Sequence, residues 1–505
     1  MKAESRYLSM ALIVSAFTTA TVGAQTPRGG DPCVGPYHVT SAEELIAAIN
    51  CANAAPDPDT IYLNADITLT SIDNVTTGNN GLPVVNSPII IEGQGHVLER
   101  DVNSADMFRF VLLVGGGDLT MNSVTVRNGV QTLAGGAVFL AGGGALRVVD
   151  CTFTVNEGKS GGGAIGLIGL NSSVVIERSI FTLNKALNGS EGGALLIVNG
   201  ARATIHDSAF VGNHALLAGG AIGNVSDDDQ LTIVNCLIAG NRTDGPGNGD
   251  GGGGGVYNAG ALHMVNCTIA GNYSRYAGGL RNYTNGVANV TNCLIGGNFG
   301  RQNGPQITNN GVLNLRYSGL QDGIPAISGA GVVNDLGGLI TFAGADELFV
   351  DPIDPNLSPT TAGDYRLVSG APGVDAADYD GFVAAGGGMA DLDGAPRTVD
   401  SCVDDNGIFG SVGYLDMGPY ESQDDGPDND GNGVPDICDG PCGGLPLGDV
   451  NESGAIDLAD VSSLAAIVLD DAGATSGQRC AADVNEDGAV DGLDIQAFVN
   501  LLLTQ

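Results

Sequence analysis

A short segment recurs along the middle of the chain, and this repeat constrains the fold more than any other feature of the sequence. It has the form L-x-V-x-N-C-x-I-x-x-N and appears as VVDCTFTVN, IVNCLIAGN and VTNCLIGGN, among others. The last residues of its copies are Asn128, Asn156, Asn184, Asn213, Asn241, Asn272 and Asn298, which are 26 to 31 residues apart. Between them a Gly-Gly pair recurs as a second landmark, as in GGAI ending at Ile165. A nearly constant period in this range indicates a solenoid or an array.

Apolar and polar residues alternate inside each copy, as at Leu231 and Ile233, and this alternation predicts short strands. A single strand cannot bury its apolar face, but copies stacked about 4.8 Å apart pair in parallel and enclose one apolar interior. Propeller blades are excluded because each needs about 40 to 50 residues. The sequence therefore predicts an all-β fold, a parallel β-helix solenoid.

Two residue columns of the repeat have predicted roles at one corner of the coil. The first column is Asn122, Asp150, Arg178, Asp207, Asn235, Asn266 and Asn292. Asn and Asp tolerate a left-handed backbone better than other non-glycine residues. The second column, just inside the corner, is Ser123, Cys151, Ser179, Ser208, Cys236, Cys267 and Cys293. Cys151 and Cys236 would lie about 14 Å apart, too far for a disulfide, so we expect buried free thiols.

The first 24 residues are typical of an export signal. Lys2 and Arg6 precede an apolar run, and Val22 to Ala24 form a small-residue cleavage site. No later apolar stretch reaches the roughly 18 to 20 residues that a membrane helix needs. We therefore expect a secreted or cell-surface protein without a transmembrane anchor, in which the ten cysteines are compatible with disulfides.

The segment TSAEELIAAINCANA predicts an amphipathic helix that covers the open N-terminal end of the solenoid. Ser41 and Glu44 have the spacing of a capping box. Cys33 and Cys51 flank this region and are a candidate disulfide pair, although their spacing alone does not prove the pairing.

The GGA-I and F-x-x-N landmarks resemble the repeats of secreted bacterial right-handed β-helix proteins, including the polymorphic outer-membrane-protein and pectate-lyase-like groups. The segments GDYRL, GAPGVDA, DGAPR and DMGPYE resemble the choice-of-anchor Q region that follows such helices. The resemblance implies a right-handed β-helix with its cap over residues 25–330 and closing coils over residues 331–421. These motifs specify a shape rather than a reaction.

The composition changes at Glu421, after which the chain is strongly acidic. From there on, 18 acidic residues face the single Arg479, so this stretch carries −17 of the net charge of −38. Two segments, DVNESGAIDLAD and DVNEDGAVDGLD, place oxygen donors at positions 1, 3, 5, 9 and 12 and glycine at position 6, as in a calcium loop. The predicted Ca²⁺ ligands are Asp449, Asn451, Ser453, Asp457 and Asp460, and Asp483, Asn485, Asp487, Asp491 and Asp494.

Each loop precedes a helical apolar pattern, and the pair resembles the type I dockerin module. The resemblance implies a small α-helical calcium-binding domain over residues 443–505 and a cohesin-like partner. The positions that match the family's recognition residues are Leu458-Ala459 and Gly492-Leu493 rather than a hydroxyl pair, so a cell-envelope protein is an alternative partner. Ser453 replaces the usual Asp or Asn, and we expect the first loop to bind Ca²⁺ more weakly than the second.

A third acidic segment, DNDGNGVPDICD, lies in a predicted acidic linker over residues 422–442. It resembles a thrombospondin type 3 calcium repeat, and the implied ligands are Asp428, Asp430, Asn432, Asp436 and Asp439. A solvated acidic linker without bound metal is the alternative.

The overall charge excludes some classes of partner. With 57 acidic against 19 basic residues, the chain lacks the basic surface that nucleic acids or anionic lipids need. Trp is absent and aromatic residues make up 5% of the chain, which counts against a surface rich in sugar-stacking rings.

The best candidates for catalytic residues on the repeats are Asp150, Arg178 and Asp207, on consecutive coils. Their two carboxylates would lie about 10 Å apart, near the separation that inverting glycosidases use. These residues occupy the corner column, however, and opposite charges on neighbouring coils neutralise one another. We therefore favour a structural role for them.

Other polar residues of the repeats carry no recognisable site pattern. His206 and His214 lack the spacing of a metal site or a nucleophile–base pair and are predicted to lie on the surface. The acidic run at residues 227–229 is predicted to be a solvated turn.

Two functions remain from the sequence. The first is a non-catalytic adhesion or scaffold protein, secreted or on the cell surface, whose calcium-dependent tail attaches it to a partner. The second is a polysaccharide lyase or O-glycosyl hydrolase that its dockerin tethers. We favour the first because Lys159 and Lys185 are the only lysines after the signal and carboxylates are few on the repeats.

Overall fold

The computed structural model describes two separate units of the chain. The described residues are 33–188, 190–245, 251–301, 304–368, 370–397 and 415–422 in the larger unit and 447–451, 453, 455–469, 474, 476–485 and 489–503 in the smaller one. The predicted export signal and the predicted thrombospondin type 3-like loop lie outside these residues.

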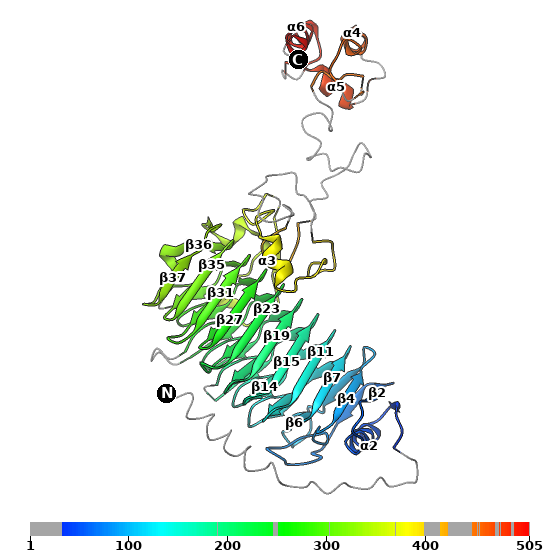
Figure 1. The fold of residues 1–505 in the computed structure, drawn as a ribbon, viewed down its shortest axis with the longest axis vertical. Coiled ribbons are helices and arrows are strands. Elements are labelled where there is room, and N and C mark those ends of the chain that lie inside the picture. Colours follow the sequence, from blue (N-terminus) through cyan, green and yellow to red (C-terminus); the bar gives the residue numbers. More distant parts are fainter. Residues whose placement is uncertain are drawn as a thin grey trace. The chain divides into compact units, whose positions relative to one another are not determined.

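Parallel sheets run through the larger unit, and each inner coil adds one strand to each of them (Figure 1). We name them sheets A, B, C and D in the order in which the chain visits them. Sheet A contains β1 (Tyr37–Val39), β2 (Asp59–Leu63), β4 (Pro88–Glu92), β7 (Asp118–Asn122), β11 (Ala145–Val149), β15 (Ser173–Glu177), β19 (Arg202–His206), β23 (Gln230–Val234), β27 (Ala261–Val265), β31 (Val287–Thr291), β35 (Val312–Arg316) and β37 (Val332–Asp335). Sheet B contains β3 (Ile67–Leu69), β5 (Val97–Arg100), β8 (Thr125–Arg127), β12 (Thr152–Thr154), β16 (Ile180–Thr182), β20 (Ala209–Val211), β24 (Leu237–Ala239), β28 (Thr268–Ala270), β32 (Leu294–Gly296), β36 (Gly319–Gln321) and β38 (Ile340–Phe342).

The other two sheets are built from shorter strands. Sheet C contains β9 (Val130–Gln131), β13 (Glu157–Gly158), β17 (Lys185–Ala186), β21 (His214–Ala215), β25 (Arg242–Thr243), β29 (Tyr273–Ser274) and β33 (Phe299–Gly300). Sheet D contains β6 (Val111–Val114), β10 (Val138–Ala141), β14 (Ile165–Ile168), β18 (Leu195–Val198), β22 (Ile222–Asn224), β26 (Val256–Asn258), β30 (Leu280–Asn282) and β34 (Ile307–Asn309). Equivalent residues of successive coils pair in parallel, as Phe153 does with Phe181. The predicted parallel solenoid is confirmed.

Buried asparagines form a ladder at the turn between sheets B and C. The members are Asn156, Asn184, Asn213, Asn241, Asn272 and Asn298, which are 0 to 5% exposed. The side-chain oxygen of each, from the second onward, accepts the backbone N–H and the side-chain N–H of the asparagine before it, at 2.8 to 3.1 Å. The ladder pairs polar groups that would otherwise be buried without partners. The predicted alignment of the repeat asparagines is therefore confirmed from Asn156 onward.

The first copy of the repeat lies one residue away from its predicted register. Strands β8 and β12 pair Thr125 with Thr152, a spacing of 27 residues rather than the 28 of the alignment. Asn122 consequently ends strand β7, and Ser123, with φ of 49°, takes the corner. The first side-chain oxygen of the ladder accepts the N–H of Gly129, so Asn128 is not a ladder member.

The two corner columns otherwise have the predicted geometry. Asp150, Arg178, Asp207, Asn235, Asn266 and Asn292 have φ between 45° and 55°. The cysteines just inside the corner, Cys151, Cys236, Cys267 and Cys293, are buried and free, as expected. Burial raises the pKa of Cys151 to about 11, so its thiol stays protonated and unreactive.

Helix α2 (Ala42–Ala52) covers the N-terminal end of the solenoid, as predicted. Its N-cap Ser41 accepts the N–H of Glu44 at 3.3 Å. The Glu44 carboxylate accepts the N–H and the hydroxyl of Thr40 instead of the N–H of Ser41. The reciprocal half of the predicted capping box is thus displaced by one residue, and the helix still buries Leu45 and Ile49 over the first coils.

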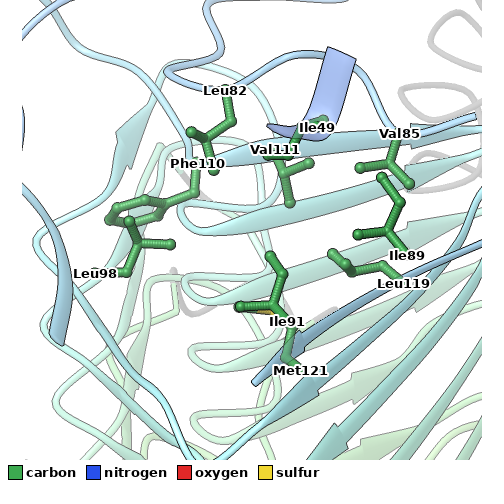
Figure 2. Close-up of a pocket in the computed structure, with 10 residues that line it drawn as sticks. All are labelled: Ile49, Leu82, Val85, Ile89, Ile91, Leu98, Phe110, Val111, Leu119 and Met121. Carbon is green, nitrogen blue, oxygen red and sulfur yellow. The ribbon is translucent and has the colours of Figure 1, made fainter. Parts of the chain in front are cut away.

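A small gap remains in the core beneath α2 (Figure 2). Its volume is about 10 Å³, and its lining is Ile49, Leu82, Val85, Ile89, Ile91, Leu98, Phe110, Val111, Leu119 and Met121. A space of this size holds at most one water, and the lining offers no polar partner. It is a packing gap and not a ligand site.

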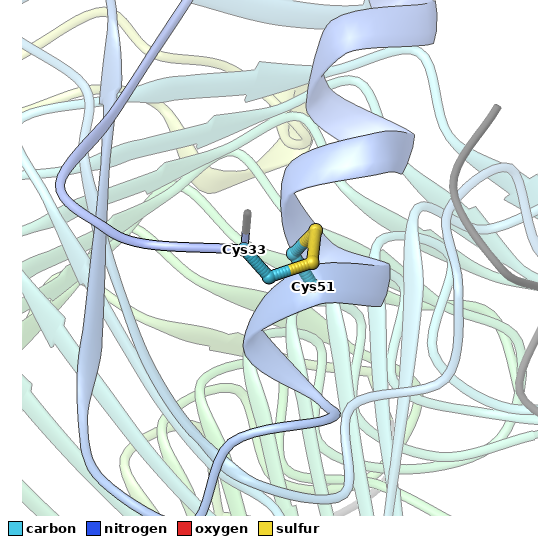
Figure 3. Close-up of a disulfide and its surroundings, with 2 residues drawn as sticks. All are labelled: Cys33 and Cys51. Carbon is cyan, nitrogen blue, oxygen red and sulfur yellow. A yellow bond between two sulfur atoms is a disulfide. The ribbon is translucent and has the colours of Figure 1, made fainter. Parts of the chain in front are cut away.

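A disulfide between Cys33 and Cys51 joins the segment before β1 to helix α2 (Figure 3). The two Cα atoms are 5.2 Å apart, within the usual range for a disulfide. The candidate pair of the sequence is confirmed.

After β38 the chain adds no further strand to the parallel sheets. The predicted closing coils therefore extend only to residue 342. The following residues contain the 3₁₀ turns η2 (Ala345–Glu347) and η3 (Pro355–Leu357), the antiparallel pair β39 (Phe349–Asp351) and β40 (Asp364–Leu367), and helix α3 (Tyr379–Ala384). We name residues 345–368, 370–397 and 415–422 the wrap segment, because they pack along the outside of sheet B and bury Leu237 and Leu294. Helix α3 of this segment is yellow in Figure 1.

Glycine residues at the corner between sheets B and C allow the wrap segment to approach the solenoid closely. In the coils that it covers, the residue before each ladder asparagine is glycine, and the N–H of Thr360 donates to the carbonyl of Gly240 at 3.0 Å. A Cβ on Gly240 would lie 2.3 Å from the Thr360 oxygen. In coils that the wrap leaves uncovered, the equivalent residues are Val155 and Leu183, which are 47% and 37% exposed.

The DGAPR and DMGPYE motifs hold the wrap segment in place. Arg397 of the first motif is fully buried, ion-paired with Glu421 of the second at 3.4 Å, and donates to the Gly418 carbonyl at 2.7 Å. Corner asparagines complete the attachment: the side chain of Asn292 exchanges two hydrogen bonds with the backbone of Asp378, at 2.8 Å each.

The smaller unit is helical, as predicted for the tail. It contains α4 (Asp460–Leu469), α5 (Ser476–Ala482) and α6 (Gly492–Leu502). Its core includes Val450, Leu464, Ile467, Ala482 and Phe498. In the described residues, none of the helices combines the length and the apolar character that crossing a bilayer requires.

Candidate functional site

The two predicted calcium loops of the tail share a set of internal hydrogen bonds. In the first loop, the carboxylate of Asp460 accepts the N–H groups of Asn451 and Asp457, both at 2.9 Å. In the second loop, the carboxylate of Asp494 accepts the N–H groups at the equivalent positions 3 and 9, at 3.1 and 2.8 Å. The carboxylate at position 12 therefore closes each loop onto the start of the helix that follows.

The ninth position of each loop caps that helix. Asp457 accepts the N–H of Ala459 at 2.6 Å, and Asp491 accepts the N–H of Leu493 at 2.7 Å. Asp491 and Asp494 together form a capping box at α6. Loop geometry and helix start are thus fixed by the same side chains.

The oxygen donors of the first loop fit a hard divalent cation. Asp449 and Asp460 are fully buried, and burial of a carboxylate is unfavourable unless a cation or hydrogen bonds compensate its charge. The side-chain oxygen of Asn451 is buried without a hydrogen-bond partner, as expected for an atom that would contact a metal ion. Ser453 lies at the same loop and is exposed.

The second loop is described in part. Asp494 is fully buried, Asp483 and Asn485 are partly buried, and Asp491 is exposed. Asp487 lies outside the described residues, as do Asp428, Asp430, Asn432, Asp436 and Asp439 of the third predicted loop. In the part of the chain that the structure describes, no three His, Cys, Asp or Glu side chains converge as a metal site. The predicted Ca²⁺ ligands of both loops also include Asn side chains, and those of the first loop include the hydroxyl of Ser453.

An apolar groove of about 580 Å³ lies between α4 and α6. Its lining is Leu458, Val461, Leu464, Ala465, Ile495, Phe498, Val499, Leu502 and Leu503. Leu458 and Leu503 are 79% and 80% exposed, although leucine is usually buried. Leu493, the other recognition position inferred from the sequence, is 63% exposed at the start of α6. Exposed apolar side chains gathered on one face are typical of a binding surface.

The catalytic candidates of the repeats are engaged in contacts between coils. Asp150 and Arg178 form a two-bond ion pair at 2.8 and 3.0 Å, and this hydrogen bonding raises the pKa of Arg178. Asp207 accepts the side-chain N–H of Asn235 at 2.7 Å. Both carboxylates thus already have a partner on the next coil, Arg178 for Asp150 and Asn235 for Asp207.

Sequence reasoning missed a file of polar side chains on sheet C. Glu157, Lys185, His214, Arg242 and Tyr273 occupy equivalent positions of consecutive coils. The file could have been found by extending the repeat alignment by one residue, because each member directly follows a ladder asparagine. It places carboxylate, ammonium, imidazole and guanidinium groups in one row.

Two side chains of this file, His214 and Arg242, share one carboxylate partner. Asp244 bridges His214 at 2.9 Å and Arg242 at 2.7 Å. Arg242 also lies 4.2 Å from the ring centre of Tyr273 and donates to the Ser358 carbonyl of the wrap segment at 2.9 Å. His214, predicted to lie on the surface, therefore has a mostly buried side chain that is hydrogen-bonded to Asp244, whereas His206 is half-buried at the end of β19.

One acidic residue predicted to be solvated is buried. Asp227 and Asp228 are exposed, but Asp229 is fully buried and accepts the N–H groups of Gly200 and Ser226, both at 2.8 Å. Burial raises the pKa of Asp229 to about 7. The residue closes a turn between coils.

Two family models match the chain. Residues 59–238 match the model described as right handed beta helix region, and residues 447–503 match the dockerin type I domain. No curated protein matches the chain. Type I dockerin domains generally bind calcium and imply a cohesin partner. The chain therefore contains a right-handed β-helix region followed by a C-terminal type I dockerin domain.

Proposed function

We propose that the protein is a secreted or cell-surface, non-catalytic adhesion or scaffold protein, attached through its dockerin domain to a cohesin-bearing partner. The observation that carries the proposal is the exposed apolar groove between α4 and α6, which begins beside both calcium loops. A β-helix is a rigid rod of stacked coils, and the dockerin would supply its attachment.

The groove defines the chemistry of the partner. Its exposed rim is apolar at Leu458, Val499 and Leu503, so contact would exclude water from aliphatic surface rather than pair hydroxyl groups. Burial of apolar area contributes about 25 cal/mol per Å² before the entropic cost of association. A cohesin surface with apolar residues at the contact is therefore the expected partner.

Calcium would shape this groove. The proposed ligands Asp457 and Asp460 of the first loop flank Leu458, and α4 begins at Asp460. Asp491 and Asp494 of the second loop hold the start of α6 in the same way. Ca²⁺ held by these oxygen donors would fix both helix starts, and its removal would separate the two sides of the groove.

A binding experiment with the full chain tests the proposal. A purified cohesin domain is immobilised, and retention is measured with Ca²⁺ and with a chelator. We expect calcium-dependent retention that Leu458→Asp and Leu503→Asp each reduce at least tenfold. Leu469→Asp is the matched control, because Leu469 is 84% exposed on α4 but does not line the groove.

Two results would contradict this function. One is the absence of calcium-dependent retention on any cohesin tested, combined with retention on a cell-envelope protein. The other is an equal loss in the control and groove variants, which would place the contact elsewhere on the tail.

Polysaccharide degradation is the second candidate, and the file on sheet C is the observation that favours it. Glu157 and Lys185 are adjacent in this file, and Lys185 is exposed. An assay of reducing ends and unsaturated products on acidic and neutral polysaccharides, with Ca²⁺ present, separates the two functions. Turnover that Glu157→Gln abolishes, or that Asp150→Asn or Asp207→Asn abolishes, would replace the scaffold proposal.

A further inference from the structure

The two ends of the solenoid differ in how their apolar interior is covered. At the N-terminal end, α2 buries Leu45 and Ile49 to 1% exposure or less. At the other end, Ile327, Val333 and Leu339 pack against the core but remain only partly buried. One coil earlier, Leu313, the register partner of Val333, is fully buried. Figure 1 shows α2 and β37 at opposite ends of the solenoid.

The last strands also present free edges. Strands β37 and β38 stand last in sheets A and B, and within the described residues no strand pairs with their outer sides. Val332 and Leu336, in and after β37, are 56% and 58% exposed. An unpaired strand edge beside exposed apolar side chains is a template for pairing with another chain.

A ladder of exposed amides leads to this edge. Asn314 donates to Asn289 at 2.7 Å, and Asn334 of β37 donates to Asn314 at 2.8 Å. The ladder ends at Asn334, at the last strand of sheet A. A strand added beyond β37 would continue it.

The charge of this end permits contact between copies of the chain. Asp335 is the only charged residue from Gly323 to Ala343, although the whole chain carries −38. Long-range repulsion between acidic molecules is screened within about 8 to 10 Å at moderate salt. The end coil thus offers little charge to oppose contact between two copies at close range.

We infer that a second copy of the same chain covers this end, so that two solenoids join through their last coils. A two-fold axis pairs β37 antiparallel with its counterpart and makes the contact isologous. Antiparallel pairing centred on Asn334 keeps side chains of the same sheet face opposite each other, with Val332 across from Leu336 and Asp335 across from Val333 of the other copy, so the two carboxylates do not face each other. Because α2 covers the opposite end, head-to-tail growth is blocked and the assembly closes as a dimer.

Solution mass measured on the full chain tests this inference. Light scattering or sedimentation over a concentration series is expected to show twice the mass of the chain. Val332→Lys and Leu336→Lys, at exposed positions that leave the core intact, are expected to give the monomer. Val287→Lys is the matched control, because Val287 is 40% exposed in the same column of sheet A two coils inward. It should leave the dimer intact.

Further readouts distinguish the last coil from other contacts. Hydrogen exchange at β37 should slow as concentration rises, while exchange at β31 stays constant. Leu458→Asp in the dockerin groove should not change the mass. A wild-type chain that stays monomeric at the highest soluble concentration overturns the inference. So does a dimer that survives both lysine variants or that Leu458→Asp dissociates.

Discussion

Replacement of Asn213 by alanine tests the buried asparagine ladder most directly. Asn213 is fully buried. Its oxygen accepts two hydrogen bonds from Asn184, both at 3.0 Å. Its side-chain N–H groups donate to the Phe181 carbonyl at 2.8 Å and to Asn241 at 3.1 Å. Alanine fills none of these roles.

The expected loss of stability follows from the groups left without partners. The backbone N–H and one side-chain N–H of Asn184 lose their acceptor, and the Phe181 carbonyl loses a donor. Each buried polar group without a partner costs about 1 to 3 kcal/mol. A carbonyl has two lone pairs and costs less than a donor, so we expect Asn213→Ala to lower the free energy of unfolding by about 3 to 6 kcal/mol.

The assay compares this variant with Asn314→Ala in the exposed amide ladder. Asn314 makes similar amide–amide bonds to Asn289 and Asn334, at 2.7 and 2.8 Å, but water can replace them. A surface change of this kind alters stability by about 0.5 kcal/mol. Urea unfolding is followed by circular dichroism of the β-sheet signal, because the chain has no Trp. If both variants lose the same stability, the buried ladder does not contribute as argued.

Three further predictions rest on other contacts. The hydrogen bond from His214 holds the pKa of Asp244 well below its usual range. The folded-state pKa is then lower than the unfolded value near 3.9, so the carboxylate stabilises the fold above about pH 4 and this stabilisation is lost on acidification. Thermal midpoints of Asp244→Asn and wild type should differ at pH 7, and the difference should shrink steadily as the pH falls below about 4. Gly240→Leu should displace the wrap segment and speed its proteolysis, whereas Leu183→Gly should not. Ser453→Asp should raise the Ca²⁺ affinity of the first loop in a titration, and equal or reversed affinities of the two wild-type loops would contradict their predicted ranking.

The fold could be predicted because equivalent residues of successive coils lie in the same surroundings and are therefore of the same type. A parallel solenoid places each residue on its equivalent one coil away, so a column such as Cys236, Cys267 and Cys293 keeps one environment. Corner residues keep a positive φ for the same reason. Where the coil length changes by one residue, as at Thr125 and Thr152, the alignment loses register, because a strand alternates its faces every residue.

The wrap segment could not be predicted, because it lacks the repeat that identifies the coils. Its motifs GDYRL and DMGPYE suggested closure, but not whether the chain closes the end or lies along the side. The glycine column at Gly240 and Gly271 carried the relevant signal. The Thr360 N–H donates to the first carbonyl and the Ser358 hydroxyl to the second, at 3.0 and 2.7 Å. A column that changes from bulky residues to glycine marks coils that another segment must approach closely.

The charged residues of the solenoid show why a column alone does not reveal a reaction. Asp150 and Glu157 lie on the same coil, but the first compensates Arg178 at the corner and the second begins the file on sheet C. Strands of sheet C are two residues long and give no alternation in the sequence. Asp244, which follows the file residue Arg242, neutralises it, and Arg242 also holds the wrap segment. A group that already carries a structural contact is less free to bind substrate, and this is the physical ground for preferring a scaffold over an enzyme.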